Sequence, residues 1–311
     1  MPVVKELSKG YGKQDTVLTI GFFDGVHLGH RHLIENLILV GKSLKMPAGI
    51  ITFNNHPASV INPRFQPNFL TSLEERLELL SSTGVDFVAP ITFDRELAAL
   101  DVEDFVKILV KHTRMRGLVI GPDFKMGKNR EGNANTLIGL GKKHGFRVKI
   151  VSSKEQQGRS IRSTAIRELV SQGEVDKIGD FLGRPFSVVG TIVPGLKRGR
   201  EIGYRTANLE QSPGMATPGD GIYATKASIK GSNDFTKLMS ATSIGTRPTF
   251  DEGVRTIECY ILDFNQNIYG EELHLEFHKR IRRELKFDTV EALVDQMKDD
   301  ILQARSILSK L

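Results

Sequence analysis

The sequence predicts an α/β amino-terminal domain with a Rossmann-like parallel sheet, followed by a small antiparallel β-barrel that ends in one helix. Up to about residue 180, short apolar runs alternate with amphipathic stretches, the pattern of a parallel sheet covered on both faces. From Phe186 onward, short β-like runs dominate and are separated by Gly, Pro, Asn and Asp, which is typical of a small barrel. We place the two domains at residues 1–182 and 183–311.

The amino-terminal part contains five apolar runs that we expect to be buried strands. They are residues 17–20, 49–53, 86–90, 118–120 and 148–151. Between the strands, Thr71 and Glu74 form a capping-box signature before an apolar stripe, and Val102 begins a second stripe with helical spacing. Parallel sheets of this kind bind ligands beyond the carboxyl ends of their strands, so we expect a site there.

The carboxyl-terminal part contains four β-like runs and one long helix. The runs are residues 186–193, 222–229, 257–264 and 273–277. Asp288 with Glu291 predicts the start of the helix, and the apolar stripe of the helix follows at residues 293, 297, 301, 304 and 308. A helical connector at 165–170 precedes the predicted boundary.

Composition narrows the class of protein. With 39% hydrophobic and 26% charged residues, the 311-residue chain can bury ordinary cores, and no apolar run approaches the roughly 18 residues of a membrane span. The start of the sequence has no apolar signal region, and the single cysteine, Cys259, excludes an internal disulfide, so we expect a cytoplasmic protein. The net charge of +6 suits an anionic ligand, either phosphates or nucleic acid.

A ten-residue string, 21–30, follows the first predicted strand and runs into a predicted helix. Gly21 and Gly25 permit a tight turn and close approach to a ligand, and Gly29 leaves room above the helix start. His27 and His30 flank that helix N-terminus, which favours phosphate through its free N–H groups and its dipole. The pattern therefore predicts a phosphate site. The alternatives are metal binding by the two histidines and a glycine turn with two surface histidines that bind no ligand.

A second glycine-rich and basic segment, 195–205, runs into Thr206 and Asn208. Its glycines expose backbone N–H groups, and the G-K-[ST] ending of a Walker A loop is missing. Thr206 and Asn208 alternate in an extended stretch, so both can face one ligand, and their oxygens suit Mg²⁺ beside phosphates. A flexible basic hairpin is the alternative. The candidate phosphate-binding residues of this segment are Gly195, Lys197, Gly199, Arg200 and Gly203.

The string 21–30 resembles the signature of the FMN adenylyltransferase module of bacterial bifunctional riboflavin kinase/FAD synthetases, and more loosely the nucleotidylyltransferase superfamily. Three further motifs at 52–57, 119–128 and 161–167 resemble that module, the second of them followed by Arg130, Gly132 and Asn133. Arg162 stands where the family usually has Ser, and Met126 where it usually has Phe. The similarity implies a nucleotidylyltransferase fold for residues 1–182.

The resemblance implies that the FMN phosphate attacks the α-phosphorus of ATP and gives FAD and pyrophosphate, which requires positioning and charge stabilisation. His27 and His30 would be the catalytic residues that hold ATP phosphates, and Arg167 would hold the departing pyrophosphate. The implied ATP site comprises Gly21, Phe23, Asp24, Gly25, His27, Gly29, His30, Ser163, Thr164 and Arg167. Asn55, Asp123 and Phe124 are implied on the flavin side.

The second segment resembles the riboflavin kinase signature, and matching motifs follow at 245–250, 257–264, 269–270 and 281–287. The resemblance assigns to Glu258 the orientation and deprotonation of the riboflavin 5′-hydroxyl, and places Arg282 and Glu284 near the flavin. It also implies Mg²⁺ for both steps, with Thr206 and Asn208 as ligands. Cys259 adjoins Glu258 on the strand, so it is expected to face the opposite way as a buried thiol.

One departure concerns the kinase module, because Arg205 replaces the family's proline immediately before Thr206. The loss of proline could loosen this loop, and the charge of Arg205 could attract ATP phosphates. One alternative hypothesis is an adenylyltransferase with a degenerate kinase module. The presence of Thr206, Asn208 and Glu258 disfavours it. A nucleic-acid-binding protein is another, disfavoured because there is no Trp and no basic stripe interleaved with aromatic residues.

The sequence therefore predicts a two-module enzyme of flavin cofactor synthesis. Its expected partners are ATP, riboflavin, FMN and FAD, with no nucleic acid and no membrane, and Mg²⁺ is its expected cofactor. The sequence leaves open the oligomeric state and the relative rates of the two steps.

Overall fold

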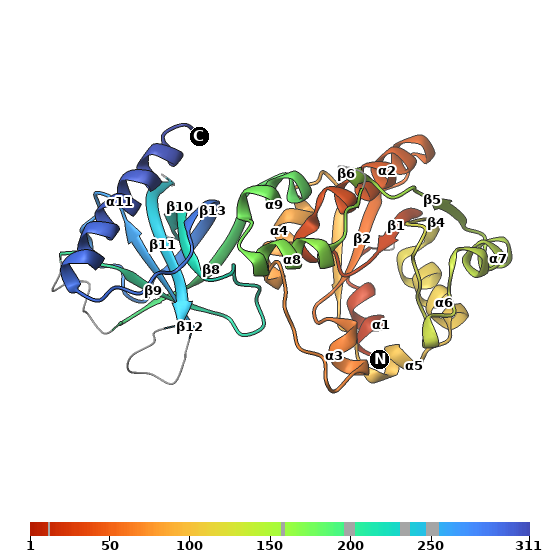
Figure 1. Ribbon diagram of the computed structural model, residues 1–311. Helices are drawn as coiled ribbons and strands as arrows, with labels where there is room; N and C mark the ends of the chain where they lie inside the picture. Colours follow the sequence, from red (N-terminus) through yellow and green to blue (C-terminus); the bar gives the residue numbers. More distant parts are fainter. Residues whose placement is uncertain (12, 157–158, 196–202, 231–236, 247–254) are drawn as a thin grey trace. The chain divides into compact units, whose positions relative to one another are not determined.

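The computed structural model describes residues 1–11, 13–156, 159–195, 203–230, 237–246 and 255–311. The chain divides into two compact units, Met1–Ser163 and Thr164–Leu311 (Figure 1). Each unit has its own hydrophobic packing. The predicted boundary at residues 182 and 183 stays a prediction.

The first unit is built on a five-stranded parallel sheet in the order β3-β2-β1-β4-β5, as the alternating pattern predicts. Its strands are β1 (Thr16–Ile20), β2 (Ala48–Phe53), β3 (Phe87–Ile91), β4 (Met115–Ile120) and β5 (Arg147–Ile150). A two-stranded hairpin, β6 (Glu155–Gln156) and β7 (Arg159–Ser160), follows. The strand order reverses between β1 and β4, which makes the carboxyl ends of these two strands the expected place for a ligand.

Helices cover both faces of this sheet (Figure 1). The helices of this unit are α1 (Pro2–Leu7), η1 (Asp24–Val26), α2 (Leu28–Leu44), α3 (Pro57–Ile61), α4 (Leu73–Ser81), α5 (Arg95–Ala99), α6 (Val102–Thr113), η2 (Lys128–Arg130) and α7 (Ala134–His144). Alternate strand residues feed two separate cores: Leu18 and Leu118 pack with α6 and α7, whereas Val17 and Val119 pack with α2. This alternation explains why the strands read as continuous apolar runs.

The second unit contains a closed six-stranded barrel in the order β10-β11-β12-β9-β8-β13, which confirms the predicted antiparallel barrel. Its elements are α8 (Ser163–Gln172), α9 (Val175–Leu182), β8 (Phe186–Val193), β9 (Ala207–Gln211), β10 (Gly221–Ile229), β11 (Leu238–Thr246), β12 (Arg255–Ile261), β13 (Glu272–Arg282) and α11 (Val290–Leu308). The terminal helix packs on β10 and β11 through Ala304 and Leu308, whose partners are Ala224 and Ala241.

Helix α9 covers a second side of the barrel. It packs against β13 and β8, and it buries Val175, Ile178, Phe181 and Leu182. The helix before it is tied to the barrel as well, because the Arg280 Nη1 donates to the Gln172 carbonyl at 3.0 Å and the Gly219 N–H donates to the Val170 carbonyl at 2.9 Å. Residues before 183 therefore pack against the strands of the barrel.

Three local predictions were wrong. The cap of α4 is Ser72, whose Oγ accepts the Glu75 N–H at 3.1 Å, and not Thr71. The cap of α11 is Thr289, and not Asp288. Strand β12 ends at Ile261 rather than at residue 264, because the backbone turns through a positive φ of 57° at Asp263. Strands β9 and β11 were not identified as β-runs.

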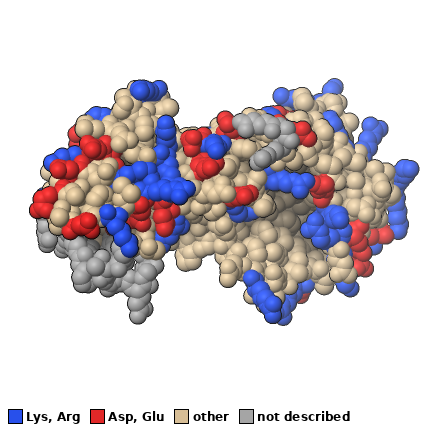
Figure 2. All heavy atoms as spheres, viewed as in Figure 1, with Lys and Arg blue, Asp and Glu red and all other residues tan. Residues whose placement is uncertain are grey.

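Among the described helices, none is both long enough and apolar enough to cross a membrane. On the face that Figure 2 shows, Lys and Arg side chains lie among Asp and Glu side chains in each unit. Although the chain has 43 basic and 37 acidic residues, basic and acidic side chains are mixed on this face.

A fragment of residues 164–311 should be more stable than a fragment of residues 183–311. The shorter fragment loses the four buried apolar side chains of α9, each of which contributes about 1.5–3 kcal/mol. We expect its Tm, measured by circular dichroism, to be lower by more than about 10 °C, or the fragment to remain unfolded. Equal Tm values would show that α9 contributes nothing to the barrel.

Candidate functional site

The first candidate site lies at the reversal point of the parallel sheet. The string 21–30 connects β1 to α2, and the segment containing Asp123 and Phe124 follows β4. Because β1 and β4 are adjacent and parallel, their carboxyl ends bring these two segments to the same edge of the sheet.

The backbone of the first segment is held in unusual conformations. Phe23 and Val26 have positive φ values of 57° and 40°, and Gly25 has a φ of 78°. Left-handed backbone is costly for a residue other than glycine, and most of all for a β-branched one such as Val26. Strain of this kind persists only where the surroundings enforce it, and it concentrates at ligand-binding segments.

The Asp24 side chain enforces this conformation. Asp24 is 3% exposed, and its carboxylate accepts the Leu70 N–H at 3.0 Å and the Thr71 N–H at 3.2 Å. In return, the Thr71 Oγ1 accepts the Gly25 N–H at 3.1 Å. Asp24, which the resemblance assigned to ATP, therefore uses its carboxylate oxygens to bind the segment before α4. Thr71 belongs to this anchor rather than to a helix cap.

The two histidines are stacked at the start of α2. Their ring centroids are 3.6 Å apart with an interplanar angle of 14°, and His27 is the N-cap residue of the helix. The His27 Nδ1 accepts the His30 N–H at 3.2 Å, so the proton of a neutral His27 ring is on Nε2. A Cβ at Gly29 would lie only 3.1 Å from the His27 Nδ1 and 3.3 Å from the Ile161 carbonyl, so a larger residue would press on the capping ring.

The His30 ring packs against Phe23 as well as against His27, with ring centroids 5.2 Å apart for His30 and Phe23. Its Nδ1 is buried and has no hydrogen-bond partner among the described residues. Burial of the ring, and to a smaller extent the charge of His27, lowers the pKa of His30 well below its ordinary value of 6.5. His30 is therefore neutral at pH 7 in the absence of ligand.

A buried arginine that the sequence analysis missed supports both loops. Arg76 is 2% exposed, its Nη2 donates to the Phe53 carbonyl at 2.6 Å, and its guanidinium lies 4.0 Å from the Phe22 ring centroid. It thereby joins the ends of β1 and β2. The signal was present in the sequence, because Arg76 is four residues before Leu80 and so occupies a core-facing position of α4.

The Asn55 amide is engaged with backbone. Its Oδ1 accepts the Phe93 N–H at 3.0 Å and its Nδ2 donates to the Phe93 carbonyl at 2.8 Å. This pair of bonds ties the segment after β2 to the segment after β3. His56, next in the chain, caps α3 through its Nδ1 and stacks on Phe65 at 4.7 Å.

The segment after β4 folds onto the start of α6. Met126 and Gly132 exchange backbone hydrogen bonds of 2.9 and 3.2 Å, and a Cβ at Gly127 would lie 2.8 Å from the Val102 Cα. Asp123 is exposed, and its carboxylate accepts the Arg162 Nη2 at 2.8 Å. Phe124 is half-buried against the core beneath.

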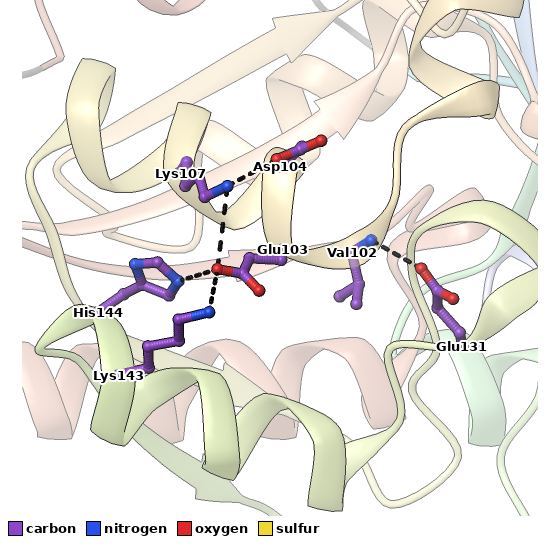
Figure 3. Close-up of polar contacts among 7 residues, drawn as sticks. All are labelled: Val102, Glu103, Asp104, Lys107, Glu131, Lys143 and His144. Carbon is purple, nitrogen blue, oxygen red and sulfur yellow. Dashed lines mark hydrogen bonds and ion pairs between the residues drawn. The ribbon is translucent and has the colours of Figure 1, made fainter.

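Charged contacts fasten this segment further (Figure 3). The Glu131 carboxylate accepts the Val102 N–H at 2.9 Å and so caps α6. The Glu103 carboxylate accepts Lys143 Nζ at 2.7 Å and His144 Nε2 at 2.9 Å, which links α6 to α7 and lowers the pKa of Glu103. The part of the chain that follows Asp123 is thus fixed to α6 at two points.

The predicted residues of the 161–167 motif lie at the beginning of α8. The Ser163 Oγ donates to the Asp24 carbonyl at 3.1 Å, so Ser163 adjoins the first segment. Thr164 is exposed and Arg167 is half-buried on the same helix, and both fall in the second compact unit. Their assignment to ATP stays a prediction.

The second candidate site lies on the outer side of the barrel. Asn208 on β9 pairs with Glu258 on β12, and their sequence neighbours Ala207, Leu209 and Cys259 are buried. Asn208 and Glu258 consequently face away from the barrel interior on adjacent strands. The Thr206 Oγ1 donates to the Glu258 Oε2 at 3.2 Å, so the three predicted residues are brought together.

Two glycines of the second unit leave room for predicted site residues. A Cβ at Gly195 would overlap the Asn208 amide, and a Cβ at Gly245 would overlap the Glu284 carboxylate. Partial burial and the charge of Asp220 raise the pKa of Glu284. Gly203 has a positive φ of 88°, whereas the predicted phosphate-binding residues Lys197, Gly199 and Arg200 lie outside the described residues.

Arg282 has a strong internal partner. Its Nε and Nη2 donate to the Asp300 carboxylate at 2.9 and 2.7 Å, and the Asp300 side chain is 6% exposed. This paired contact fastens β13 to α11. The predicted position of Arg282 near a flavin stays a prediction.

Cys259 is buried, and its thiol points into the barrel. Burial raises the pKa of this thiol to about 11. The described residues include no group of three or more His, Cys, Asp or Glu side chains placed to hold a metal ion by themselves.

Comparisons with known proteins cover both units. A family model described as FAD synthetase matches residues 11–165, and one described as riboflavin kinase matches residues 182–308. A protein of Listeria monocytogenes, named bifunctional riboflavin kinase/FMN adenylyltransferase, is 35% identical over 95% of this chain and 93% of its own length. The protein of that name from Escherichia coli K12 is 35% identical over 94% of this chain and 93% of its own.

A solved structure has the same fold throughout. A crystal structure from Streptococcus pneumoniae, described as a macrolide-efflux protein, is 31% identical and has a TM-score of 0.86. The match covers 98% of this chain and 97% of that one. The likeness therefore includes both the parallel sheet and the barrel.

Substituting His30 should change how stability depends on pH. The folded pKa of His30 is lowered, so as the pH falls below 6.5 the unfolded chain binds a proton there before the folded chain does, and the free energy of unfolding decreases. In urea unfolding between about pH 7 and pH 5, His30→Gln should lose less stability than the native protein. Near pH 8 the position-30 side chain is uncharged in both proteins, folded or unfolded. The difference between their free energies of unfolding at that pH therefore gives the effect of the substitution on packing alone. An identical pH dependence in both proteins would contradict a buried neutral His30.

Proposed function

The chain belongs to the bifunctional riboflavin kinase/FMN adenylyltransferase family, and on this premise we propose which of its residues carry the two reactions. The protein phosphorylates riboflavin with ATP to give FMN, and it adenylylates FMN with a second ATP to give FAD and pyrophosphate. We assign adenylyl transfer to the edge of the parallel sheet and phosphorylation to the outer side of the barrel.

In adenylyl transfer, an FMN phosphate oxygen forms a bond to the α-phosphorus of ATP while the bond to pyrophosphate breaks. The protein has to hold both phosphates in line and neutralise the charge that develops. We propose that the Nε2–H of His27 donates to an ATP phosphate, since its Nδ1 is used in capping α2. The N–H groups at the start of α2 and the His30 ring beside His27 complete the phosphate contact.

We propose that the segment after β4 contacts the flavin in this reaction. Asp123 and Phe124 lie beyond the carboxyl end of the strand adjacent to β1. For Asn55 we propose a supporting role, because both polar atoms of its amide bind the Phe93 backbone. The same holds for Asp24, whose carboxylate shapes the segment that carries the histidines.

In phosphorylation, the riboflavin 5′-hydroxyl forms a bond to the γ-phosphorus of ATP, and ADP leaves. The observation that carries this assignment is the grouping of Thr206, Asn208 and Glu258 on one outer patch of the barrel. We propose that the Glu258 carboxylate accepts the proton of the attacking hydroxyl. Its hydrogen bond from Thr206 holds the carboxylate in place beforehand.

Enzymes of these two families use nucleotides and generally need a divalent metal ion, and we propose that the ion is Mg²⁺. A hydroxyl and an amide oxygen beside a carboxylate are hard oxygen donors of the kind Mg²⁺ accepts when phosphates supply the remaining ligands. Thr206 and Asn208 would hold it. When bound, the ion neutralises charge on the phosphates during transfer.

We also propose a cytoplasmic location. Nucleotide substrates and a single thiol buried in the barrel interior support it.

Two substitutions should separate the activities. Glu258→Gln removes the proton acceptor and should lower FMN formation by about 10²- to 10⁴-fold, while FAD formation from supplied FMN stays near the native rate. His30→Ala should lower FAD formation by about 10²-fold and leave FMN formation intact. Chromatography of riboflavin, FMN and FAD after incubation with ATP and Mg²⁺ measures both rates. Equal loss of both activities in either variant would exclude two separate sites.

A further inference from the structure

Three consecutive side chains fasten the segment before β9 to β12 and to the turn that follows it. The Tyr204 ring meets the Tyr260 ring edge-on, with centroids 5.5 Å apart. The Arg205 Nη1 donates to the Asn265 Oδ1 at 2.6 Å. Thr206 then donates to Glu258. The middle contact is the one that reaches beyond β12.

The turn that receives Arg205 is itself held in place. Its Leu262 N–H donates to the Met239 carbonyl at 2.9 Å, and Asp263 adopts the left-handed conformation there. The Asp263 carboxylate accepts the Arg305 Nη2 of α11 at 2.7 Å. Asn265 is therefore attached to a turn that both β11 and the terminal helix fix.

Residue 205 has more backbone freedom than a proline would have at this position. A proline at position 205 would restrict φ and reduce the conformations of the free chain. Arginine has a freer backbone, so ordering the residue that precedes Thr206 costs more conformational entropy. A short hydrogen bond from a charged guanidinium can offset part of that cost.

We propose that Arg205 is a positioning residue for riboflavin phosphorylation, which acts by binding Asn265 and so holding the Thr206 hydroxyl against Glu258. The Arg205–Asn265 contact takes the place of the constraint that a proline would give. The proposal rests on the kinase site assigned above. It differs from a direct contact of Arg205 with ATP phosphates, which would not involve Asn265.

The test compares Arg205→Ala, Asn265→Ala, the double variant and Arg205→Pro in the full chain. Arg205→Ala and Asn265→Ala should each lower kcat/KM for FMN formation by about fivefold, as expected for one lost hydrogen bond. The double variant should be no worse than either single variant, because both remove the same contact. Arg205→Pro should recover most of the native rate, since it restores order through the backbone.

FAD formation from supplied FMN is the internal control and should be unchanged in all four variants. The rates are measured at low and high ionic strength. A loss in Arg205→Ala that Asn265→Ala does not share, and that disappears at high salt, would show a phosphate contact and overturn the proposal. Native rates in Arg205→Ala, or an Arg205→Pro variant as slow as Arg205→Ala, would overturn it as well. Full FMN formation by Glu258→Gln would instead contradict the assigned kinase site.

Discussion

The first unit depends on the burial of one carboxylate. Asp24 lies at the turn between β1 and α2, and its oxygens bind N–H groups of the segment before α4. Its own carbonyl accepts the Ser163 hydroxyl. A buried polar group is tolerated only when it is well paired, and here the side chain of Asp24 holds the 70–71 segment while its backbone carbonyl holds Ser163. The strained backbone of Phe23 and Val26 and the stacked histidines follow from that arrangement.

In the barrel, strand alternation positions the polar residues of the second candidate site. Cys259 and Glu258 are neighbours in sequence, yet one faces the closed interior and the other faces outward beside Asn208. A one-residue slip of β12 would exchange them and destroy the patch. The strand register, which closure of the barrel fixes, therefore aligns the polar groups. Side-chain contacts such as the Thr206–Glu258 hydrogen bond then hold these groups in position.

Sequence reasoning predicted the parallel sheet and the barrel because apolar runs are local signals, whereas the placement of Glu258 in one site with Thr206 and Asn208 was implied by the resemblance to riboflavin kinases. It missed β11 because the inward positions of that strand carry Ser240 and Thr242, whose hydroxyls both bind the Thr225 hydroxyl at 2.7 Å. Because these inward-facing residues carry hydroxyl groups, the sequence of β11 lacks the alternation of apolar and polar residues by which a strand is recognised. The anchoring role of Asp24 was missed for another reason, since its partners lie 46 and 47 residues away along the chain.

The lone thiol inside the barrel has a practical consequence for spectroscopy. The thiolate is the form that alkylating labels attack, and the Cys259 thiol has a pKa of about 11 and no exposed surface. The folded native chain is thus unreactive towards maleimide reagents. A cysteine introduced at any exposed position would be the one reactive thiol, so fluorophores or spin labels could be attached to either unit without first removing a native residue.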